Sequence, residues 1–508
     1  MAQGPSFLPS PFIENEGSTP YSSITGFAFA SLEGPILLTR EPKTAECAMA
    51  CQNLTHYFKD QVLHPNTAPY GDFRTNYWAA QQQALAPACV FSPADASQVA
   101  YLVRLSQGTN WPFAVKSGGH GAFAGPSNIE NGIAVSLKRL NEIAVSDDLS
   151  LVEIGVGNNW MTVYEKLEEY RLAVAGGRYP SVGVGGLSLG GGQSFFATTQ
   201  GLTYLHWALR GGGNNFGIVT KITMETISLT ECKMWGGVRV YTENKFSELL
   251  QAADNLGNLV SDDGAKSAQI INFSFLEAIK IAAAVLTHSD PERRPAAMSE
   301  YLSIPALADT TRVRSLTDMT ADLASLERAL PGSDDSIILK ARGTATFSLN
   351  TDILAFAKDT CFDEFDKIAD IEGVKPMCVF QIITKGQLEA TVAKGGNAMG
   401  LDPEEGPLFL LNTQAGWTED SDSDSSRVKQ ALQSVIKRTS TYAKERGWGK
   451  EFQYMNYAGE FQDIIAGYGE DNKRELVTIA DRYDPEAVFQ RLQPNYFKLV
   501  GAPVNNSF

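Results

Sequence analysis

Apolar and polar residues alternate along this chain with two different periods. The segment SPADASQVAYLVRLSQ places Val99, Leu102 and Val103 at helical spacing after a capped start, which predicts an amphipathic helix. Residues 160–170 repeat that spacing and predict a second helix. The short apolar runs PFAVKSG, GIAVSL, IAVS and LVEIGVG, separated by turn residues, predict strands. The mixture indicates an α+β fold.

The stretch from 230 to 450 mixes both periods again and resembles a second lobe. Its strand-like runs are GGVRVY, QIINFSF, MCVFQIIT and PLFLLNTQ. The acidic segment EDSDSDSS, residues 419–426, predicts an exposed loop before a helix that starts near Arg427. A chain of 508 residues exceeds one ordinary core, so two lobes are expected.

Charge and composition narrow the classes of partner. The 58 acidic residues outnumber the 42 Lys and Arg, and the net charge of −16 disfavours nucleic acid and anionic membrane surfaces. No apolar run is long enough to cross a bilayer. The opening residues lack the basic start and apolar centre of a signal peptide, so a cytoplasmic location is favoured over a secreted one.

Six cysteines in a chain of this length do not form a disulfide framework. Cys47 and Cys51 share a helical face with apolar residues, which predicts burial. A bridge from either one to Cys89 requires an oxidising compartment. A zinc site would add His56 and His64, but their spacing exceeds the usual ligand spacing, and no metal site is predicted.

Glycine clusters in three loops: VKSGGHGAFAG, GGRYPSVGVGGLSLGGGQS and ALRGGGNNFG. Glycine at that density is unfavourable in backbone entropy, so the backbone there must bend sharply or approach something closely. Loops of this kind present backbone N–H groups that bind anions without basic side chains. Several such loops predict a long dinucleotide gripped at several points, which indicates FAD.

Two other chemistries use similar loops. A nicotinamide-binding turn requires an acidic residue about 20 positions on, and none occurs between Glu169 and Glu225. The G-x-S-x-G pattern at residues 186–190 would make Ser188 the nucleophile of a serine hydrolase, with His288 as its base.

The motifs SGGH, GVGGLSLGGGQSFF, WALRGGGNNFGIVT and QYMNYAGEFQD occur in the order seen in berberine-bridge-enzyme-like flavin oxidases. This family lies within the vanillyl-alcohol-oxidase superfamily with its PCMH-type FAD domain, and the chain is most similar to fungal members over about residues 70–500. The resemblance implies an N-terminal extension at 1–69 and an FAD domain at 70–228. It further implies a substrate domain at 229–450, with an antiparallel sheet backed by helices, and a closing segment at 451–508 that returns to the FAD domain.

The resemblance assigns roles around the cofactor. It implies that a ring nitrogen of His120 is bonded to the flavin 8α-methyl group; the alternative is a loop histidine with local hydrogen bonds only. Arg178 would lie beside the cofactor. The other predicted FAD contacts are Lys116, Ser117, Gly118, Gly119, Gly121 and Gly125, then Val184, Gly185, Gly186, Leu187, Ser188 and Leu189, and finally Gly213, Asn214, Asn215, Phe216, Gly217, Ile218 and Val219.

The Y-x-N-Y stretch at residues 454–457 carries the predicted chemistry. By resemblance, Asn456 contacts the polar edge of the flavin, Tyr454 lines the pocket and Tyr457 takes a proton from the substrate. The alternative for Tyr457 is packing between the lobes. Gln381 resembles a residue of the substrate sheet that faces the flavin.

One departure from the family pattern concerns the FAD domain. In family members a hairpin lies between the segment that matches GGGQSFFATTQ and the segment that matches WALRGGG. Here GLTYLHWALRGGG follows GGGQSFFATTQ directly, so a hairpin near 202–206 is predicted to be absent. The cysteine that some members bond to flavin is absent as well.

We expect an FAD-dependent oxidation of a small organic molecule, such as a secondary metabolite, an alcohol or a sugar, in which hydride passes to flavin N5 and dioxygen reoxidises the flavin. The alternative is a flavin-poor, inactive remnant of the fold.

Overall fold

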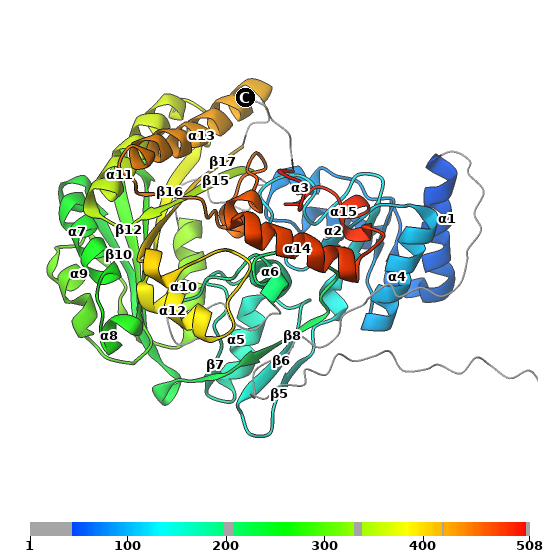
Figure 1. Cartoon of the computed structure of the whole chain (residues 1–508), viewed down its shortest axis with the longest axis horizontal. Helices are drawn as coiled ribbons and strands as arrows, with labels where there is room; N and C mark the ends of the chain where they lie inside the picture. Colours follow the sequence, from blue (N-terminus) through cyan, green and yellow to red (C-terminus); the bar gives the residue numbers. More distant parts are fainter. Residues whose placement is uncertain (1–42, 197–206, 330–337, 419–420, 504–508) are drawn as a thin grey trace, which may run out of the picture.

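A computed structural model describes residues 43–196, 207–329, 338–418 and 421–503, apart from the side chains of 43–48 and 326–329 (Figure 1). The helices are α1 (Lys43–Phe58), α2 (Ala68–Thr75), α3 (Ala80–Gln83), α4 (Ala96–Thr109), α5 (Trp160–Glu168), α6 (Val184–Leu189), α7 (Phe246–Gly257), α8 (Asp262–Ala265), α9 (Ser299–Ser303), α10 (Leu316–Ala329), α11 (Thr351–Phe365), α12 (Lys385–Ala393), α13 (Asp422–Lys444), α14 (Glu470–Tyr483) and α15 (Val488–Arg491).

A four-stranded sheet opens the first lobe, in the order β1 (Val62–Leu63), β2 (Cys89–Phe91), β4 (Ile133–Ser136) and β3 (Phe113–Lys116). β2 and β3 both pair with β4 in parallel, and their near-complete burial is typical of parallel strands covered on both faces. Helix α1 packs against α4, and a disulfide joins Cys51 to Cys89. Elements before residue 70 are therefore part of this lobe.

A three-stranded antiparallel sheet follows, in the order β5 (Ile143–Val145), β6 (Leu151–Gly155) and β8 (Lys221–Glu225). A separate strand pair joins β7 (Leu172–Ala173) to β9 (Ile227–Ser228). Helix α5 forms where the spacing of Trp160, Val163 and Leu167 predicts it, with those side chains buried. The predicted absence of a hairpin near 202–206 lies outside the described residues.

A nine-stranded antiparallel sheet dominates the second lobe (Figure 1). Its strands are β10 (Met234–Thr242), β11 (Ser267–Leu276), β12 (Ile279–His288), β13 (Ala308–Asp309), β14 (Arg312–Arg314), β15 (Leu339–Ser348), β16 (Lys375–Ile383), β17 (Leu408–Trp417) and β18 (Gly449–Lys450). Helices α7, α11 and α13 cover one face, where Phe273, Phe380 and Leu411 are buried in a common core. The predicted antiparallel sheet backed by helices is confirmed.

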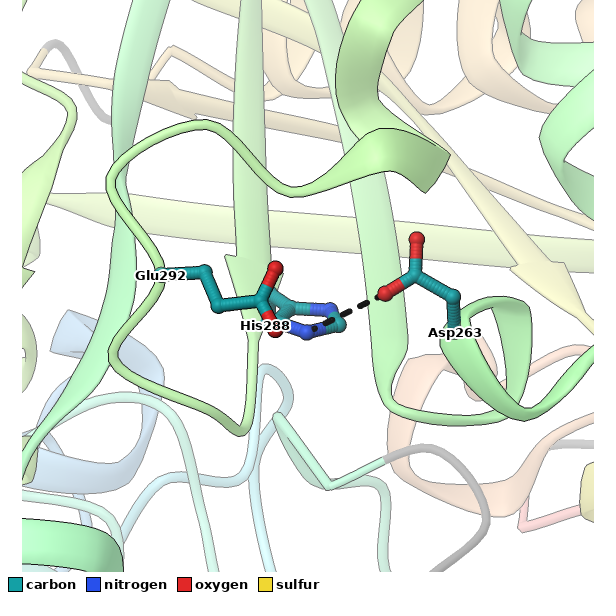
Figure 2. A group of neighbouring side chains, drawn as sticks. All are labelled: Asp263, His288 and Glu292. Atoms are coloured by element: carbon teal, nitrogen blue, oxygen red, sulfur yellow. Dashed lines mark ion pairs between the residues drawn. The ribbon is translucent and has the colours of Figure 1, made fainter.

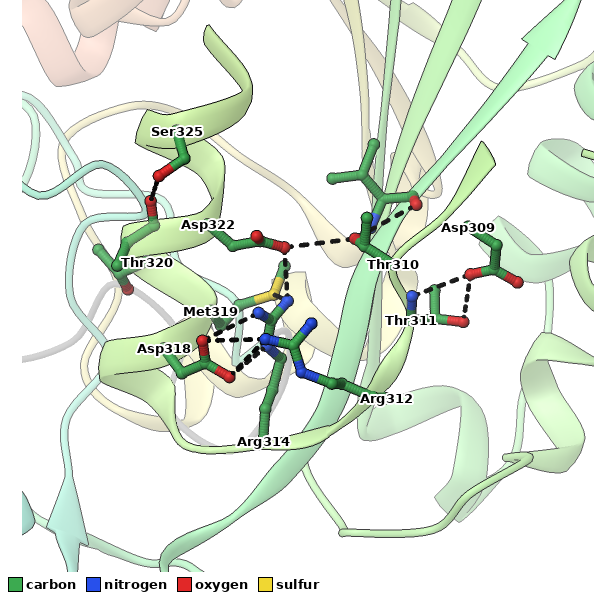
Figure 3. A network of polar contacts seen from close by, with 12 residues as sticks. Asp309, Thr310, Thr311, Arg312, Arg314, Asp318, Met319, Thr320, Asp322 and Ser325 are labelled. Atoms are coloured by element: carbon green, nitrogen blue, oxygen red, sulfur yellow. Dashed lines mark hydrogen bonds and ion pairs between the residues drawn. The ribbon is translucent and has the colours of Figure 1, made fainter. Parts of the chain in front are cut away.

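An ion-pair network attaches α10 to the edge of this sheet (Figure 3). The side chain of Arg314 on β14 is fully buried and pairs with Asp318 at 3.0 Å and Asp322 at 2.7 Å on α10. The Arg314 hydrogen bond holds the pKa of Asp318 below its usual range. Leu323 on the same helix borders the cavity that lies between the two lobes and is described below. The ion-pair network therefore helps to position one wall of that cavity.

The acidic segment before α13 differs from the prediction of a loop up to Arg427. Helix α13 already begins at Asp422, because the Ser421 side chain accepts a hydrogen bond from the amide of Asp424 and caps the helix. Asp422 and Asp424 then lie in the first turn, where negative charge is favourable to the helix dipole. A second disulfide joins Cys361 of α11 to Cys378 of β16.

The closing segment returns to the first lobe. Phe113 of β3 donates its amide to the carbonyl of Leu492, and the Asn215 side chain donates to the carbonyl of Phe497. Phe452, Tyr468 and Phe489 belong to the core of that lobe. In the part of the chain that the structure describes, no helix is both long and apolar enough to cross a membrane.

Candidate active site

A cavity of about 520 Å³ lies where the glycine loops, the large sheet and the closing segment meet. The sheet contributes the face that the helices leave uncovered. Alternate residues along each strand reach the cavity, since successive side chains of a strand point to opposite faces. They are Val238 and Val240, Ile270, Asn272 and Ser274, Ile281, Ala283 and Val285, Met377 and Val379, and Asn412 and Gln414.

Residues from all three predicted loops and from the closing segment line this one cavity. They are Ser117, Gly118, Gly119, His120 and Gly121, then Arg178, then Gly185, Gly186, Leu187 and Leu189, then Gly213, Asn214, Gly217, Ile218 and Val219, and finally Tyr454, Asn456 and Tyr457. Segments that are far apart in the sequence therefore share one concave surface, as the binding of a single extended ligand requires.

Two of the loops meet backbone to backbone. A Cβ atom added to Gly118 would lie 2.3 Å from the amide nitrogen of Gly183, so only glycine allows this approach. Ser117 joins the same contact, because its hydroxyl donates to the carbonyl of Val156 at 2.6 Å and accepts from the amide of Gly185 at 3.1 Å. The dense glycines thus bring two N–H-bearing loops together.

Lys116 and Gly125 do not line the cavity, contrary to the prediction. The Lys116 ammonium donates to the carbonyl of Asn76 and lies over the ring of Tyr77, 3.7 Å from its centroid. Burial lowers the pKa of Lys116 to about 7. Gly125 packs against Asn495, which a Cβ atom would approach to 2.3 Å. Both residues pack against other parts of the first lobe and so help to hold the loop in place.

Several other predicted contacts are also turned away from the cavity. Val184 and Phe216 are buried in the core, and Asn215 is fully buried with its amide donating to the carbonyls of Gly212 and Phe497. Ser188 lies on α6 outside the lining. Its proposed hydrolase partner His288 contacts Ser267 instead, so the hydrolase alternative has no nucleophile–base pair.

His120 lies in the cavity wall beside an aromatic ring. The imidazole stacks on Trp78 with ring centroids 5.6 Å apart, and its Nε2 lies 2.8 Å from the hydroxyl of Ser181. Burial, reinforced by the cations of Arg342 and Lys340, lowers the pKa of His120 to about 3. The ring is therefore neutral at physiological pH and can act as a nucleophile.

Tyr457 belongs to a network that joins both lobes. Its hydroxyl accepts a hydrogen bond of 2.6 Å from Arg178 and donates one of 3.1 Å to the side-chain oxygen of Gln381, to which Arg178 also donates at 3.0 Å. Gln381 is buried and lies behind the cavity lining, where its amide donates to Gln193. A positive charge thus lies beside the tyrosine oxygen.

Asn456 and Tyr454 anchor the closing segment to the second glycine loop. The Asn456 amide donates to the carbonyl of Leu187 at 3.0 Å and to the hydroxyl of Tyr454 at 2.9 Å. Burial raises the pKa of Tyr454 well above its ordinary value. Tyr454 therefore stays protonated at physiological pH.

Part of the cavity lining was not predicted from the sequence. Trp78, Tyr179 and Arg342 border the cavity, and the Arg342 guanidinium lies 4.2 Å from the centre of the Trp78 ring. The polar lining residues Asn272, Asn412 and Gln414 of the large sheet were not predicted either. Alternation in INFSF, residues 271–275, was an available signal, because Asn272 and Ser274 fall on every second position between apolar residues. Asn412 and Gln414 carry no such signal, because the polar residue Thr413 lies between them.

The wall formed by residues 118–122 fits a pyrophosphate. None of its five successive backbone N–H groups donates a hydrogen bond to protein within the described residues. Unpaired N–H groups in a cavity wall call for an acceptor, and a run of them suits an anion. Gly186 leaves open space as well, since a Cβ atom built there meets no atom of the described part of the chain within 4 Å. The donor set and the space both suit FAD.

Comparison with known proteins agrees with this geometry. The profile of a family described as an FAD binding domain matches residues 87–217. The FAD-dependent monooxygenase FUP4 of Fusarium proliferatum is 32% identical over 503 residues, covering 90% of this chain and 95% of the relative.

The chain belongs to the family of FAD-linked oxidoreductases that includes FUP4.

Solved structures share the fold of this FAD-linked oxidoreductase. 6-Hydroxy-D-nicotine oxidase from Arthrobacter nicotinovorans superimposes with a TM-score of 0.67 at 18% identity, covering 85% of this chain and 96% of that one. Berberine bridge enzyme superimposes with a TM-score of 0.67 at 13% identity, covering 87% and 97%. The predictions of the family, the fold and an FAD-linked enzyme are thereby confirmed.

Proposed function

We propose that this enzyme oxidises a small organic molecule in the described cavity, with FAD bonded to His120 and with Tyr457 as the acceptor of the substrate's proton. The observation that carries the proposal is the shared cavity. The glycine loops with unpaired N–H groups, the neutral imidazole of His120 and the Arg178–Tyr457 pair all border it. FAD, when bound, accepts a hydride from the substrate and passes both electrons to dioxygen, which becomes hydrogen peroxide.

His120 is suited to the covalent bond by its hydrogen bonding. Nε2 faces the Ser181 hydroxyl, so Nδ1 is the nitrogen left for the flavin methyl group. Since burial and neighbouring cations keep the ring neutral, its lone pair is available without prior loss of a proton. Stacking on Trp78 fixes the plane of the imidazole.

Proton transfer is assigned to Tyr457. The substrate would lose a hydride from its C–H bond and a proton from the adjacent O–H or N–H group, which leaves a C=O or C=N bond. Tyr457 would take that proton as a phenolate, after its own hydroxyl proton, which it donates to Gln381 in this structure, has passed to solvent. Arg178 donates to that oxygen and stabilises negative charge on it, while Gln381 fixes its position. The lining that faces this pair is mainly aliphatic, which suits an organic substrate such as a fungal secondary metabolite, alcohol or sugar.

The test combines colour, reduction and peroxide. The purified protein should be yellow, and anaerobic mixing with a panel of alcohols, sugars and phenolic or polyketide metabolites should bleach the flavin with one of them. Readmitted air should then restore the colour and release one peroxide per product. Incorporation of oxygen from ¹⁸O₂ into the product would instead indicate a monooxygenase, the activity for which FUP4 is named. A colourless preparation would indicate the flavin-poor remnant.

We also propose that the chain folds in an oxidising compartment, in place of the cytoplasmic location expected from the sequence. The Cys51–Cys89 and Cys361–Cys378 disulfides support this, because such bonds persist in secretory and extracellular environments and are rare in the cytosol. Non-reducing peptide mapping of protein purified from its native cells tests this directly. Free thiols at all four positions would contradict it.

A further inference from the structure

Three ionisable side chains converge outside the active-site cavity, at the end of a strand that helps to form it. His288 is the last residue of β12, Asp263 lies on α8, and Glu292 lies in the loop that follows β12 (Figure 2). The imidazole nitrogen and the two carboxylates offer ligand atoms that all lie within 4.8 Å of one another. None of these residues takes part in the proposed oxidation.

The hydrogen bonds of Ser267 set the tautomer of His288. The Ser267 hydroxyl donates to the backbone carbonyl of Asp263 at 2.9 Å, so its oxygen must accept from Nδ1 of His288, 3.0 Å away. We therefore assign the proton of the neutral ring to Nδ1. Nε2 then carries a lone pair, as a metal-ligating histidine requires, and Ser267 acts as the outer partner that orients the ring.

Among the residues that the structure describes, Nε2 of His288 has no hydrogen-bond partner, although the residue is fully buried. The nearest acid is Asp263, whose Oδ1 lies 3.4 Å away, beyond the usual range of an N–H···O bond. A lone pair facing a carboxylate oxygen is repulsive unless a cation lies between them. Two ligands bound at about 2.1 Å to one tetrahedral ion are about 3.4 Å apart, so the observed separation is the one an ion would impose.

The carboxylates are placed to complete such a site. Asp263 is held by its other oxygen, Oδ2, which accepts from the backbone amide of Ala297, so Oδ1 remains directed at His288. Glu292 is exposed and can close over an ion by a small side-chain rotation, which also gives a path from solvent. Nearby Asp290 is engaged elsewhere, since it pairs with Lys266 at 2.7 Å.

We propose that Asp263, His288 and Glu292 bind a divalent zinc-like cation. The single imidazole favours a first-row transition ion over Mg²⁺ or Ca²⁺, which prefer sites made of oxygen atoms alone. The ion ties α8, the end of β12 and the following loop together, and so stabilises a strand whose residues Ala283 and Val285 border the active-site cavity. Its role is structural.

A Ser-His-Asp hydrolytic triad is the competing interpretation of the same residues, and the geometry opposes it. In a triad the serine gives its proton to the ring nitrogen opposite the acid, and the serine is open to substrate. Here Ser267 is 1% exposed, and its proton is directed to a backbone carbonyl. It cannot reach a substrate.

The test is zinc binding by the full-length, flavin-loaded protein after removal of metals with a chelator. Titration calorimetry with Zn²⁺ should give one saturable site per chain, and the melting temperature should rise as the site fills. Glu292→Gln and Asp263→Asn should each weaken binding about tenfold or more. Asn at 263 retains an oxygen for the Ala297 amide, so the fold is preserved, which an unchanged flavin spectrum verifies.

Asp290→Asn is the matched control, because it removes a neighbouring acid that is not a ligand. Its zinc affinity should stay within about twofold of the wild type. The proposal is overturned if the wild-type protein shows no saturable zinc binding, or if Glu292→Gln and Asp263→Asn bind zinc as tightly as Asp290→Asn. Binding that all four proteins share would come from surface histidines such as His56.

Discussion

Arg178 donates a hydrogen bond of 2.6 Å to the hydroxyl of Tyr457, although 278 residues of chain separate the two. Arg178 comes from the second glycine-rich loop and Tyr457 from the closing segment. The bond therefore depends on the return of the C-terminal segment to the first lobe. It places a fixed positive charge where a phenolate would form, which is the electrostatic arrangement that proton transfer to tyrosine needs.

Replacing Tyr457 with Phe should lower the rate of flavin reduction by about 10²- to 10⁴-fold, the range typical of lost general acid–base catalysis. Flavin content should not change, because the ring is retained and the hydroxyl alone is deleted. Stopped-flow reduction by the best substrate measures the rate. A variant that reduces its flavin as fast as the wild type would remove Tyr457 from the mechanism.

Replacing Gly186 with Ala should lower the flavin content without harming the fold. A Cβ atom at Gly186 meets no atom of the described residues within 4 Å, and alanine stabilises a helix by about 0.5–1 kcal/mol relative to glycine. Any loss must then come from a clash with the bound cofactor. The ratio of flavin to protein absorbance in purified samples measures it.

Gly71→Ala is the matched control for Gly186→Ala. Gly71 is also helical, on α2, and a Cβ atom there likewise meets nothing within 4 Å, but it does not border the cavity. Its flavin content should equal that of the wild type. Equal flavin content in both variants would mean that the cofactor does not approach α6.

Replacing Arg314 with Met should destabilise the protein by about 2–4 kcal/mol, near the lower end of the range for broken buried ion pairs. The expected loss of stability is smaller than for a fully buried pair, because 44% of the Asp318 side chain is exposed to solvent. Arg312 binds the same carboxylate but is half exposed, so Arg312→Met should change stability by no more than about 1 kcal/mol. Chemical denaturation distinguishes the two, and equal losses would contradict the ranking.

Lys498 should make stability depend on pH above neutrality. Burial lowers its pKa to about 7 in the folded protein, whereas an unfolded lysine titrates near about 10.4. Between these values the unfolded chain binds the extra proton, so this group's contribution to stability rises with pH. The stability difference between wild type and Lys498→Met should therefore grow by at most about 1.4 kcal/mol per pH unit across that interval.

The exposed residue Lys444 supplies the control for the pH series. Lys444→Met should show no such trend relative to the wild type, because the side chain stays in water in both states. A parallel pH dependence for wild type and Lys498→Met would show that the ammonium of Lys498 is not desolvated in the folded protein.

Local patterns were enough to predict much of the fold. Val99, Leu102 and Val103 predicted α4 because one buried stripe at helical spacing suffices to define a helix. The start of α13 was misplaced, because an acidic run resembles a solvated loop until Ser421 is known to cap the helix. The association of β1 with the first sheet could not be predicted either, since it depends on long-range pairing with β2.

In the candidate site, too, residues within short motifs could be predicted, whereas residues placed by tertiary packing could not. Motifs brought His120, Gly186 and Tyr457 into consideration because each belongs to a short, recognisable segment. Lys116 and Gly119 lie three residues apart in the same motif, but only Gly119 borders the cavity, because the Lys116 side chain turns toward Tyr77. The motif alone could not distinguish the two positions. Residues from elements without motifs, such as Trp78, enter the site only through tertiary packing.

The central claim is that one cavity holds one FAD, bonded to His120. Peptide-resolved mass spectrometry of the acid-denatured protein tests it most directly. We predict that the peptide carrying His120 is heavier by one FAD, and that His120→Ala loses this mass while its fold is retained. A wild-type His120 peptide of unmodified mass would contradict the claim, whether or not the protein releases free flavin on denaturation.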